Sequence, residues 1–323
     1  MFTSTVGGLF LFGEQIVYSL YLKPYKNPTD LIIKLKSQNL IISDEPKASV
    51  ILSKINYFRF KIYLRPFLDI AIKQFRANSK FEDAYQLYSF DEELKNILFS
   101  IISQIEINLR TKLDQYVTSY TNNPFWYLDN QYFSNESKNF TTKVSLKNEF
   151  LRSQDDFTLH YKENYVNDVC NDFKEMPPFW IISELSTFGN ILAIFEAIDK
   201  KPFILPHNKN VLDELSQEFG AKNLKELNSW LKLIRDVRNR TAHHSRVWNC
   251  NYREPHGIRQ SLSVSLQPSQ PNKIYLFFII LETLHQKQIV EKDIKTEIKI
   301  LLKKYPTTQR FINSMGIPQG WLV

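Results

Sequence analysis

Six side chains suited to binding or cleaving a phosphodiester lie within ten residues of one another, in the last third of the chain: Arg235, Arg238, Asn239, Arg240, His243 and His244. Histidine transfers protons near neutral pH, and a guanidinium offers phosphate oxygens a permanent forked charge. Cleavage of a phosphodiester bond needs such a pair. The chain has only 6 histidines, and two of them are adjacent here.

The geometry of this cluster depends on where the helix before it ends. If the helix continues, Asn239 and His243 are four residues apart and share a face, so the amide can orient the imidazole or a neighbouring arginine. Arg238 lies five residues before His243. Both side chains can meet one phosphate if the helix ends between them.

Three other interpretations fit the same residues. Arg and His in the last turn of a helix stabilise its C-terminal dipole without any further role. The arginines can also bind phosphate without cutting it. A metal held by His243, Cys250 and His256 is the third, but their spacing matches no standard zinc pattern and no fourth ligand is evident. We therefore expect no metal.

Other catalytic motifs are absent from the sequence, which contains no H-E-x-x-H, G-x-S-x-G or G-x-G-x-x-G. Gly8 and Gly13 have the separation found in a phosphate-binding loop, but Glu14 and Gln15 follow where Lys and Ser or Thr are required. We expect no nucleotide cofactor. Acidic groups beginning at Asp44, Asp91 and Asp155 are interpreted as helix starts, where the helix dipole favours carboxylates.

Helices must position the cluster, because most of the chain has helical periodicity. One apolar face leads directly into it, formed by Leu224, Leu227, Leu231, Ile234 and Val237. The clearest helix is predicted to open at Asp91 and to break at Asn122-Asn123-Pro124. Two earlier helices are predicted to begin at Asn27-Pro28 and at Ser43-Asp44-Glu45-Pro46.

Later segments are more varied. Residues 133–147 are predicted to form a loop or short irregular helix, and residues 179–198 a buried helix interrupted near Gly189. Residues 250–272 resemble a long exposed loop. Lysines then recur at helical spacing beyond Ile289, among them Lys295, Lys299 and Lys303. They fit contacts to an RNA backbone, and equally a solvated helix face.

Composition is typical of a folded soluble protein. The chain has 323 residues, 43% of them hydrophobic, and a net charge of +7. That charge permits a nucleic-acid partner without requiring one. The chain has only 8 glycines, and this scarcity favours helices over tight hairpins. Two cysteines, Cys170 and Cys250, argue against a disulfide framework and for the cytoplasm. The apolar N-terminal residues are too short and interrupted for a signal peptide or a membrane span, so no membrane partner is expected.

The segment from Arg238 to Asn249, with the sequence RNRTAHHSRVWN, resembles the signature of the Abi-like (AbiD/AbiF) abortive-infection proteins of the HEPN superfamily. Arg238 matches the Arg of the superfamily motif, Asn239 its polar residue and His243 its His. Further similarity covers roughly residues 21–250 and includes the blocks Tyr21–Pro24, Leu40–Asp44, Ile55–Arg59, Tyr63–Phe67, Ile105–Thr111, Phe125–Tyr127 and Phe179-Trp180.

This resemblance implies an all-α, HEPN-type helical bundle with additional N-terminal and C-terminal helices. It implies a metal-independent endoribonuclease of phage defence, acting as a homodimer in which two Arg-x4-His motifs face each other. His243 is then the general acid or base, Arg238 neutralises the scissile phosphate and Asn239 holds the geometry. Supporting roles fall to His244 and Arg246. Glu106 and Arg110 can contribute to the site as well, but a simple i, i+4 ion pair on a helix face is the favoured interpretation for these two.

RNA is the expected partner, both as substrate and as a small structured regulatory RNA. Besides the lysines, Arg235 and Arg240 are the residues expected to bind it. Two alternatives stay open: a non-cleaving RNA-binding protein that forms a ribonucleoprotein, and an inert dimerisation domain. The expected organisation is an extension over residues 1–22, a helical region over 23–85, a core carrying the motif over 86–250, and a loop with basic helices over 251–323.

Overall fold

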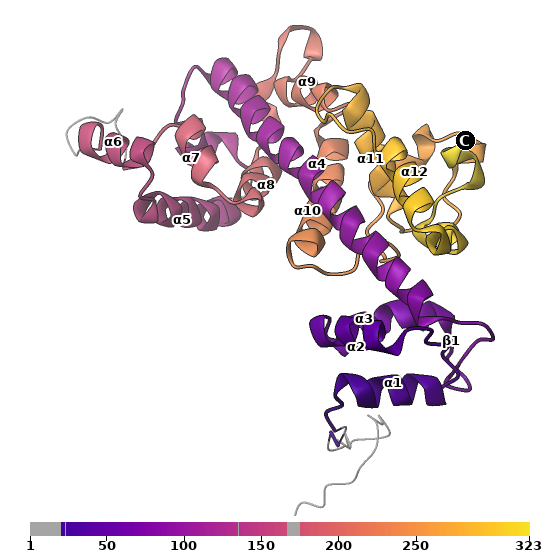
Figure 1. Ribbon diagram of the computed structural model, residues 1–323. Coiled ribbons are helices and arrows are strands. Elements are labelled where there is room, and N and C mark those ends of the chain that lie inside the picture. The colour runs from indigo at the N-terminus through magenta and orange to yellow at the C-terminus, as the bar shows by residue number, and fades with distance from the viewer. Residues whose placement is uncertain (1–20, 23, 135, 167–174) are drawn as a thin grey trace, which may run out of the picture. The chain divides into compact units, whose positions relative to one another are not determined.

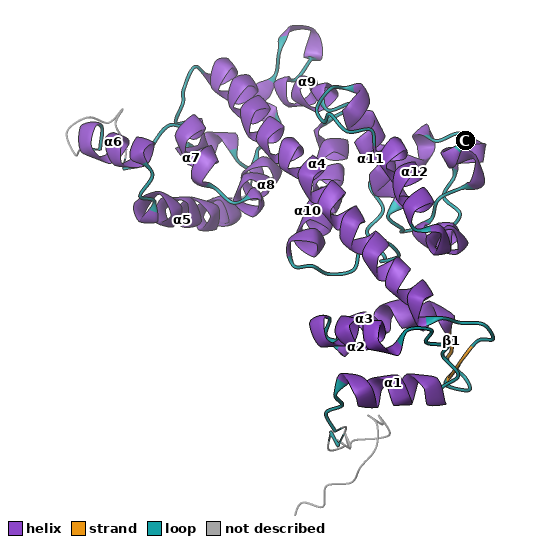
Figure 2. Cartoon of the chain, in the orientation of Figure 1, coloured by secondary structure: helices purple, strands orange, loops and turns teal. Residues whose placement is uncertain are grey.

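A computed structural model describes residues 21–22, 24–134, 136–166 and 175–323 (Figure 1). The expected extension over residues 1–22 lies almost entirely outside the described residues. The chain divides into two compact units, Met1–Tyr88 and Ser89–Val323. Helices dominate the described residues, with a single pair of two-residue strands (Figure 2). The all-α prediction is confirmed.

The described part of the first unit contains three short helices and a small hairpin. These are α1 (Pro28–Ser37), α2 (Glu45–Lys54), α3 (Tyr57–Leu64), and the antiparallel strands β1 (Leu68–Asp69) and β2 (Gln74–Phe75). Asn27 and Asp44 accept a hydrogen bond from the backbone N–H three residues on, each at 2.9 Å. Both predicted helix starts are thereby confirmed, since each combines such a cap with a proline in the first turn.

The long helix α4 (Phe81–Thr121) crosses from one unit into the next. The prediction that this helix opens at Asp91 is wrong, because its apolar face begins ten residues earlier. That face starts with Phe81, Ala84 and Leu87, each at most 1% exposed. Asp91 therefore lies inside the helix and is not its N-cap. The predicted break is confirmed, because Asn122 has a φ of 47° directly after the last helical residue.

The second unit continues with eight further α-helices in the described residues. They are α5 (Glu136–Arg152), α6 (Asp156–Asn164), α7 (Phe179–Leu185), α8 (Phe188–Ala197), α9 (Val211–Glu218), α10 (Leu224–Ala242), α11 (Tyr275–Gln286) and α12 (Ile294–Lys304). In Figure 1, α5, α7 and α8 gather on one side of α4, and α11 and α12 on the other. Helix α10 packs on α8, α9 and α11, so it is central to this unit.

Two of the later predictions change in detail. The loop or short irregular helix expected over residues 133–147 is instead the regular helix α5. Its polar sequence hides two well-buried side chains four residues apart, Leu146 and Phe150, at 0% and 1% exposure. The interruption expected near Gly189 is present, but it lies just before Gly189. There Thr187 ends the break by accepting a hydrogen bond from the Asn190 backbone at 3.2 Å.

Candidate functional site

Helix α10 carries the Arg and His cluster on its last turn and its C-terminal cap. The helix begins at the cap residue Asn223, whose side chain accepts a hydrogen bond from the Glu226 backbone at 3.0 Å. It ends at Ala242, with His243 as the C-cap. The last helical residue, Ala242, is thus followed directly by His243, five residues after Arg238.

The chain leaves α10 through a Schellman turn. The backbone N–H of Ser245 bonds to the Arg240 carbonyl at 2.8 Å, and that of His244 bonds to the Thr241 carbonyl at 3.1 Å. His244 has a φ of 52°, the left-handed conformation that this turn needs and that glycine usually supplies. Both His243 and His244 are exposed. A fixed backbone turn therefore presents two imidazoles at the surface.

Two buried residues of α4 hold the segment that follows. Asp91 is 0% exposed, and its carboxylate accepts hydrogen bonds from the backbone N–H of Trp248 at 2.8 Å and of Val247 at 3.2 Å. Lys95, 3% exposed, donates to the His244 carbonyl at 3.3 Å and to Glu92 at 2.7 Å. From the sequence, Asp91 was interpreted as a helix start and Lys95 was not singled out. The one signal in the sequence that Asp91 lies inside a helix was the apolar face, which continues on both sides of it.

Arg238 is held from α4 as well. Its Nε donates to Glu106 Oε1 at 3.2 Å, and the two side chains are 34% and 15% exposed. Arg110 donates instead to the Ser186 carbonyl at 2.9 Å. The preference for an ion pair between Glu106 and Arg110 was therefore wrong. Because Glu106 contacts Nε, the N–H groups of Nη1 and Nη2 remain as the pair of donors that suits two oxygens of a phosphate.

Asn239 and His243 lie on the exposed side of the same helix end. Their backbones are joined, since the His243 N–H bonds to the Asn239 carbonyl at 3.0 Å. Among the described residues no hydrogen bond joins the Asn239 amide to the imidazole. The arrangement combines an exposed imidazole, an amide beside it and a guanidinium held at one edge.

The comparison with protein families identifies the chain. The family model for Abi-like proteins matches residues 50–249, a span that includes Glu106 and ends just after the segment held by Asp91. The chain belongs to the Abi-like protein family. Membership connects it with abortive infection, a defence against phage. No match was found among curated proteins or among solved structures. Across the described residues of this Abi-like protein, no helix is long and apolar enough to cross a membrane.

Arg240, which belongs to the cluster, and Arg246, which follows it, contact the loop after the turn. The Arg240 guanidinium lies 5.2 Å from the centre of the Tyr252 ring, and it bonds Asp236 at 3.3 Å and Cys250 Sγ at 3.4 Å. Burial alone would lower the pKa of Arg240, but Cys250, Tyr252 and Asp236 raise it above the ordinary value. The Arg246 carbonyl accepts a hydrogen bond from Cys250 Sγ at 2.9 Å. These contacts fix the loop beside the cluster.

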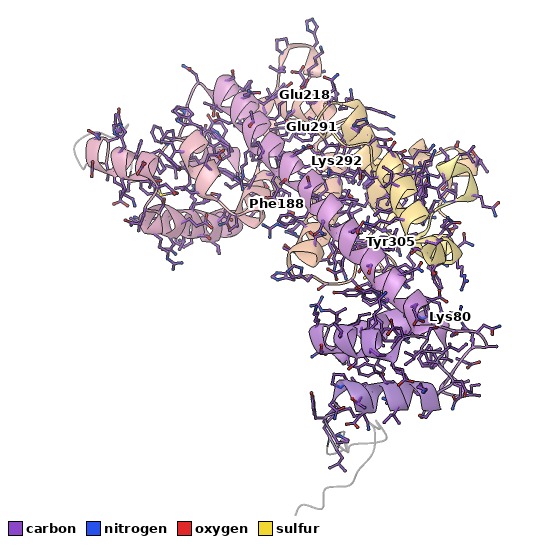
Figure 3. All side chains as sticks on the ribbon, in the orientation of Figure 1. Lys80, Phe188, Glu218, Glu291, Lys292 and Tyr305 are labelled. Carbon is purple, nitrogen blue, oxygen red and sulfur yellow. The ribbon has the colours of Figure 1, made fainter. Side chains whose placement is uncertain are left out.

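The expected RNA-binding lysines lie on α12. Lys299 and Lys303 are exposed there, while Lys295 donates to the Val323 carbonyl at 2.8 Å. Lys292 precedes the helix, and Figure 3 shows it and Tyr305 near the two ends of α12. No contact between described residues joins these lysines to the cluster on α10. Arg235 lies on α10 itself, 3.9 Å from Glu196.

The metal alternative finds no support in the side-chain geometry. Within the described part of the chain, no three His, Cys, Asp or Glu side chains converge as metal ligands would. Cys250 is buried and bonds to the Arg246 carbonyl, and the Trp248 ring packs against Phe311 at 5.8 Å between centres. The segment after the cluster is therefore a packed support for the turn.

Proposed function

We propose that this Abi-like protein is a metal-independent endoribonuclease of phage defence that cuts RNA at its Arg238-x4-His243 motif. The observation that carries the proposal is the asymmetric environment of Arg238. Its Nε is engaged by Glu106, and the same helix end bears the exposed His243. A guanidinium fixed in this way is oriented before a phosphate arrives, so less entropy is lost on binding.

The chemistry requires two proton transfers. The ribose 2′-oxygen forms a bond to the adjacent phosphorus, and the bond from that phosphorus to the 5′-oxygen of the next nucleotide breaks. One imidazole takes the proton of the 2′-hydroxyl, and another gives a proton to the departing 5′-oxygen. Arg238 neutralises the phosphate as charge develops on it. The products are a 2′,3′-cyclic phosphate, or the phosphate formed by its hydrolysis, and a 5′-hydroxyl.

Two imidazoles can come from a homodimer. One His243 per subunit supplies one base and one acid when the two motifs face each other across a two-fold axis. His244 and Arg246 then support the turn, and Asn239 holds the geometry between phosphate and imidazole. A small regulatory RNA occupying the same groups would restrain the activity.

The test is cleavage of labelled RNA in the presence of EDTA by the wild type and by His243→Ala. A matched control is His160→Ala, which removes another exposed histidine, on α6. We expect His243→Ala to lower the cleavage rate by about 10²–10⁴-fold while RNA affinity stays within about two-fold, because the loss concerns proton transfer. Equal cleavage by His243→Ala would overturn the proposal, and abolition of wild-type cleavage by EDTA would overturn metal independence.

The runner-up is a non-cleaving protein that holds a structured RNA, and the same experiment separates it. Binding without cleavage by either the wild type or His243→Ala favours this second function. Arg238→Ala is the companion variant. Because Arg238 contacts phosphate under either function, its loss should weaken RNA binding in both cases.

A further inference from the structure

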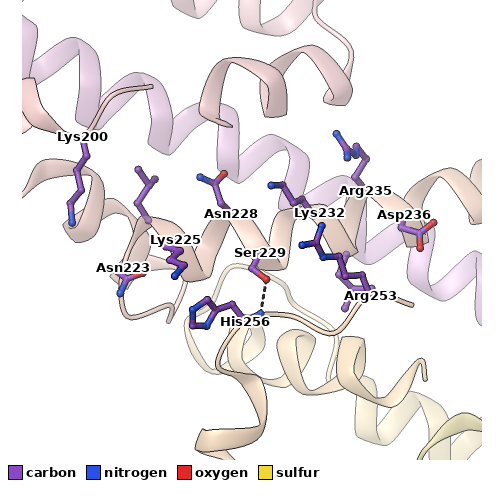
Figure 4. Close-up of a pocket in the computed structure, with 12 residues that line it drawn as sticks. Lys200, Asn223, Lys225, Asn228, Ser229, Lys232, Arg235, Asp236, Arg253 and His256 are labelled. Carbon is purple, nitrogen blue, oxygen red and sulfur yellow. Dashed lines mark hydrogen bonds between the residues drawn. The ribbon is translucent and has the colours of Figure 1, made fainter. Parts of the chain in front are cut away.

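A basic pocket of about 710 Å³ lies along the first part of α10. One wall consists of α10 side chains from Asn223 to Asp236, and the other includes Arg253 and His256 of the loop after the cluster (Figure 4). The Ser229 hydroxyl accepts a hydrogen bond from the His256 backbone at 2.6 Å and so ties the two walls together. These two segments are thus held at a fixed separation, and Lys200 adds to the lining from a third segment.

Positive charge dominates the lining. Among the described residues that line the pocket, five are cationic, namely Lys200, Lys225, Lys232, Arg235 and Arg253, and one, Asp236, is acidic. Lys200 pairs with Asp213, Arg235 lies 3.9 Å from Glu196, and Asp236 pairs with Arg240. Lys225, Lys232 and Arg253 have no ion pair with any described residue. These three cations share the pocket with one carboxylate, Asp236, that is already paired with Arg240, so they repel one another and a bound anion relieves that repulsion.

The lining also indicates which part of a nucleic acid the pocket suits. Its described residues include no phenylalanine, tyrosine or tryptophan, and the His256 imidazole is the one ring among them, so it offers little surface on which bases could stack. Its lysines, arginines, asparagines and serine are the residue types that contact phosphate and sugar. The chemistry therefore fits an extended polyanionic backbone better than a base.

Helical geometry connects the pocket to the cluster. Steps of four and three residues lead along one face of α10 from pocket residues to the cluster, through Lys225, Ser229, Lys232, Asp236, Asn239 and His243. The C-cap His243 keeps near-helical angles, with φ of −93° and ψ of 13°. At about 1.5 Å per residue this line is about 27 Å long. One strand lying along it can contact the pocket and the imidazole together.

We propose that this basic pocket binds the sugar–phosphate backbone of the same RNA strand that is cut at His243, several nucleotides from the scissile bond. The inference rests on the proposed function in taking RNA as the ligand. Arg235 was expected to bind RNA from the sequence, and the pocket adds Lys225, Lys232 and Arg253.

The experiment measures binding in a background that cannot cut. Full-length His243→Ala is titrated into a fluorescein-labelled, single-stranded 20-nucleotide RNA over a range of salt concentrations. The test variant adds Lys225→Gln, Lys232→Gln and Arg253→Gln. The matched control adds Lys47→Gln, Lys54→Gln and Lys287→Gln, three exposed lysines that are not among the residues lining the pocket. Thermal unfolding of both variants checks that each remains folded.

We expect the test variant to bind at least about 10-fold more weakly than the control. We also expect the slope of log affinity against log salt to fall by about 2, the value for three lost contacts to single-stranded phosphates. Equal affinity and equal slope in the two variants would overturn the pocket assignment. If the wild type cuts RNA but the pocket substitutions leave binding unchanged, this inference is wrong and the proposed nuclease function stands. If the pocket substitutions weaken binding but the wild type does not cut, the nuclease function is wrong and the pocket assignment stands.

Discussion

At the scale of single residues, the proposed mechanism depends most on the orientation of Arg238. Glu106 contacts its Nε from α4, so the direction of the guanidinium is set by a residue on another helix. In the proposed mechanism Glu106 is a positioning residue, because its carboxylate acts through Arg238. The ion pair is partly exposed and contributes little to stability. What the ion pair contributes is the direction of the Arg238 guanidinium.

Replacing Glu106 tests that reasoning. We expect Glu106→Ala to lower the cleavage rate by about 10–100-fold, since misplacing a catalytic group by about 1 Å costs rates of that order. Glu106→Gln retains an acceptor for Nε and should recover part of the loss. The measurement is kcat and KM on one RNA substrate. As a control, Glu218→Ala removes the partner of Lys112 in an exposed pair at 3.1 Å. If the Glu106 and Glu218 variants lose the same activity, positioning is the wrong explanation.

The site could be predicted from sequence only where its residues are neighbours in the chain. Arg238, Asn239 and His243 occupy a single helix end, so their types and spacing were visible together. Asp91 and Lys95 lie about 150 residues before the loop that they hold, as the separations of 156 and 149 residues show. Their role depends on how α4 and α10 pack. No local pattern contains that information.

At the scale of elements, α4 is the support on which the helix end is built. Two of its buried side chains, Asp91 and Lys95, hold the main chain on either side of Arg246. The helix starts at Asn27 and Asp44 were predictable because capping and proline signals are local. The start of α4 and the whole of α5 were not, because their apolar faces are recognised only once the partner helices are in place.

Asp91 provides the stability test at this scale. We expect Asp91→Ala to lower the free energy of unfolding by about 3 kcal/mol, because it leaves the Val247 and Trp248 N–H groups buried without their acceptor. Asp91→Asn keeps one acceptor and should cost about 1 kcal/mol. Urea unfolding measures both values. Asn96→Ala, at an exposed position of the same helix, should change stability by less than about 0.5 kcal/mol. A similar small effect for Asp91→Ala would contradict the assigned role.

A contact between α4 and the C-terminal end of α12 should respond to pH. Glu93 accepts hydrogen bonds from Lys304 and Tyr305, each at 2.6 Å. Burial alone would raise the pKa of Glu93, but these bonds and the charge of Lys304 lower it below the ordinary value. A lowered folded-state pKa means that the contribution to stability is complete above the unfolded pKa of about 4.3. It is lost as the pH falls through the folded-state pKa.

The matching measurement compares the Tm of the wild type and of Glu93→Gln between about pH 6 and about pH 3. We expect the wild type to be more stable at the upper end, and the difference to shrink toward zero at the lower end. Neighbouring Glu92, which bonds Lys95 instead, provides the comparison variant Glu92→Gln. A constant difference in Tm across the whole range would mean that the Glu93 carboxylate charge is not responsible.

At the scale of the whole molecule, the family match and the compact units do not coincide. The match begins at residue 50, inside the first unit, and ends at residue 249, inside the second. Helices α11 and α12 follow the match, yet α11 packs on α10 and α12 packs on α11. The C-terminal residues are therefore part of the unit that contains the cluster. The pocket uses Arg253 and His256, which also lie beyond the match.

The dimer required by the proposed mechanism makes a quantitative prediction for mixtures of subunits. If a cleavage site needs a His243 from each of two subunits, a mixed dimer of wild type and His243→Ala lacks either the acid or the base. At equal proportions and random exchange, about one quarter of dimers are wild type on both sides. Total activity should then fall as the square of the wild-type fraction. Independent monomers would give a linear fall, to about one half at equal proportions. Sedimentation equilibrium on the same mixtures reports whether dimers are present, and a linear fall would remove the two-subunit site from the mechanism.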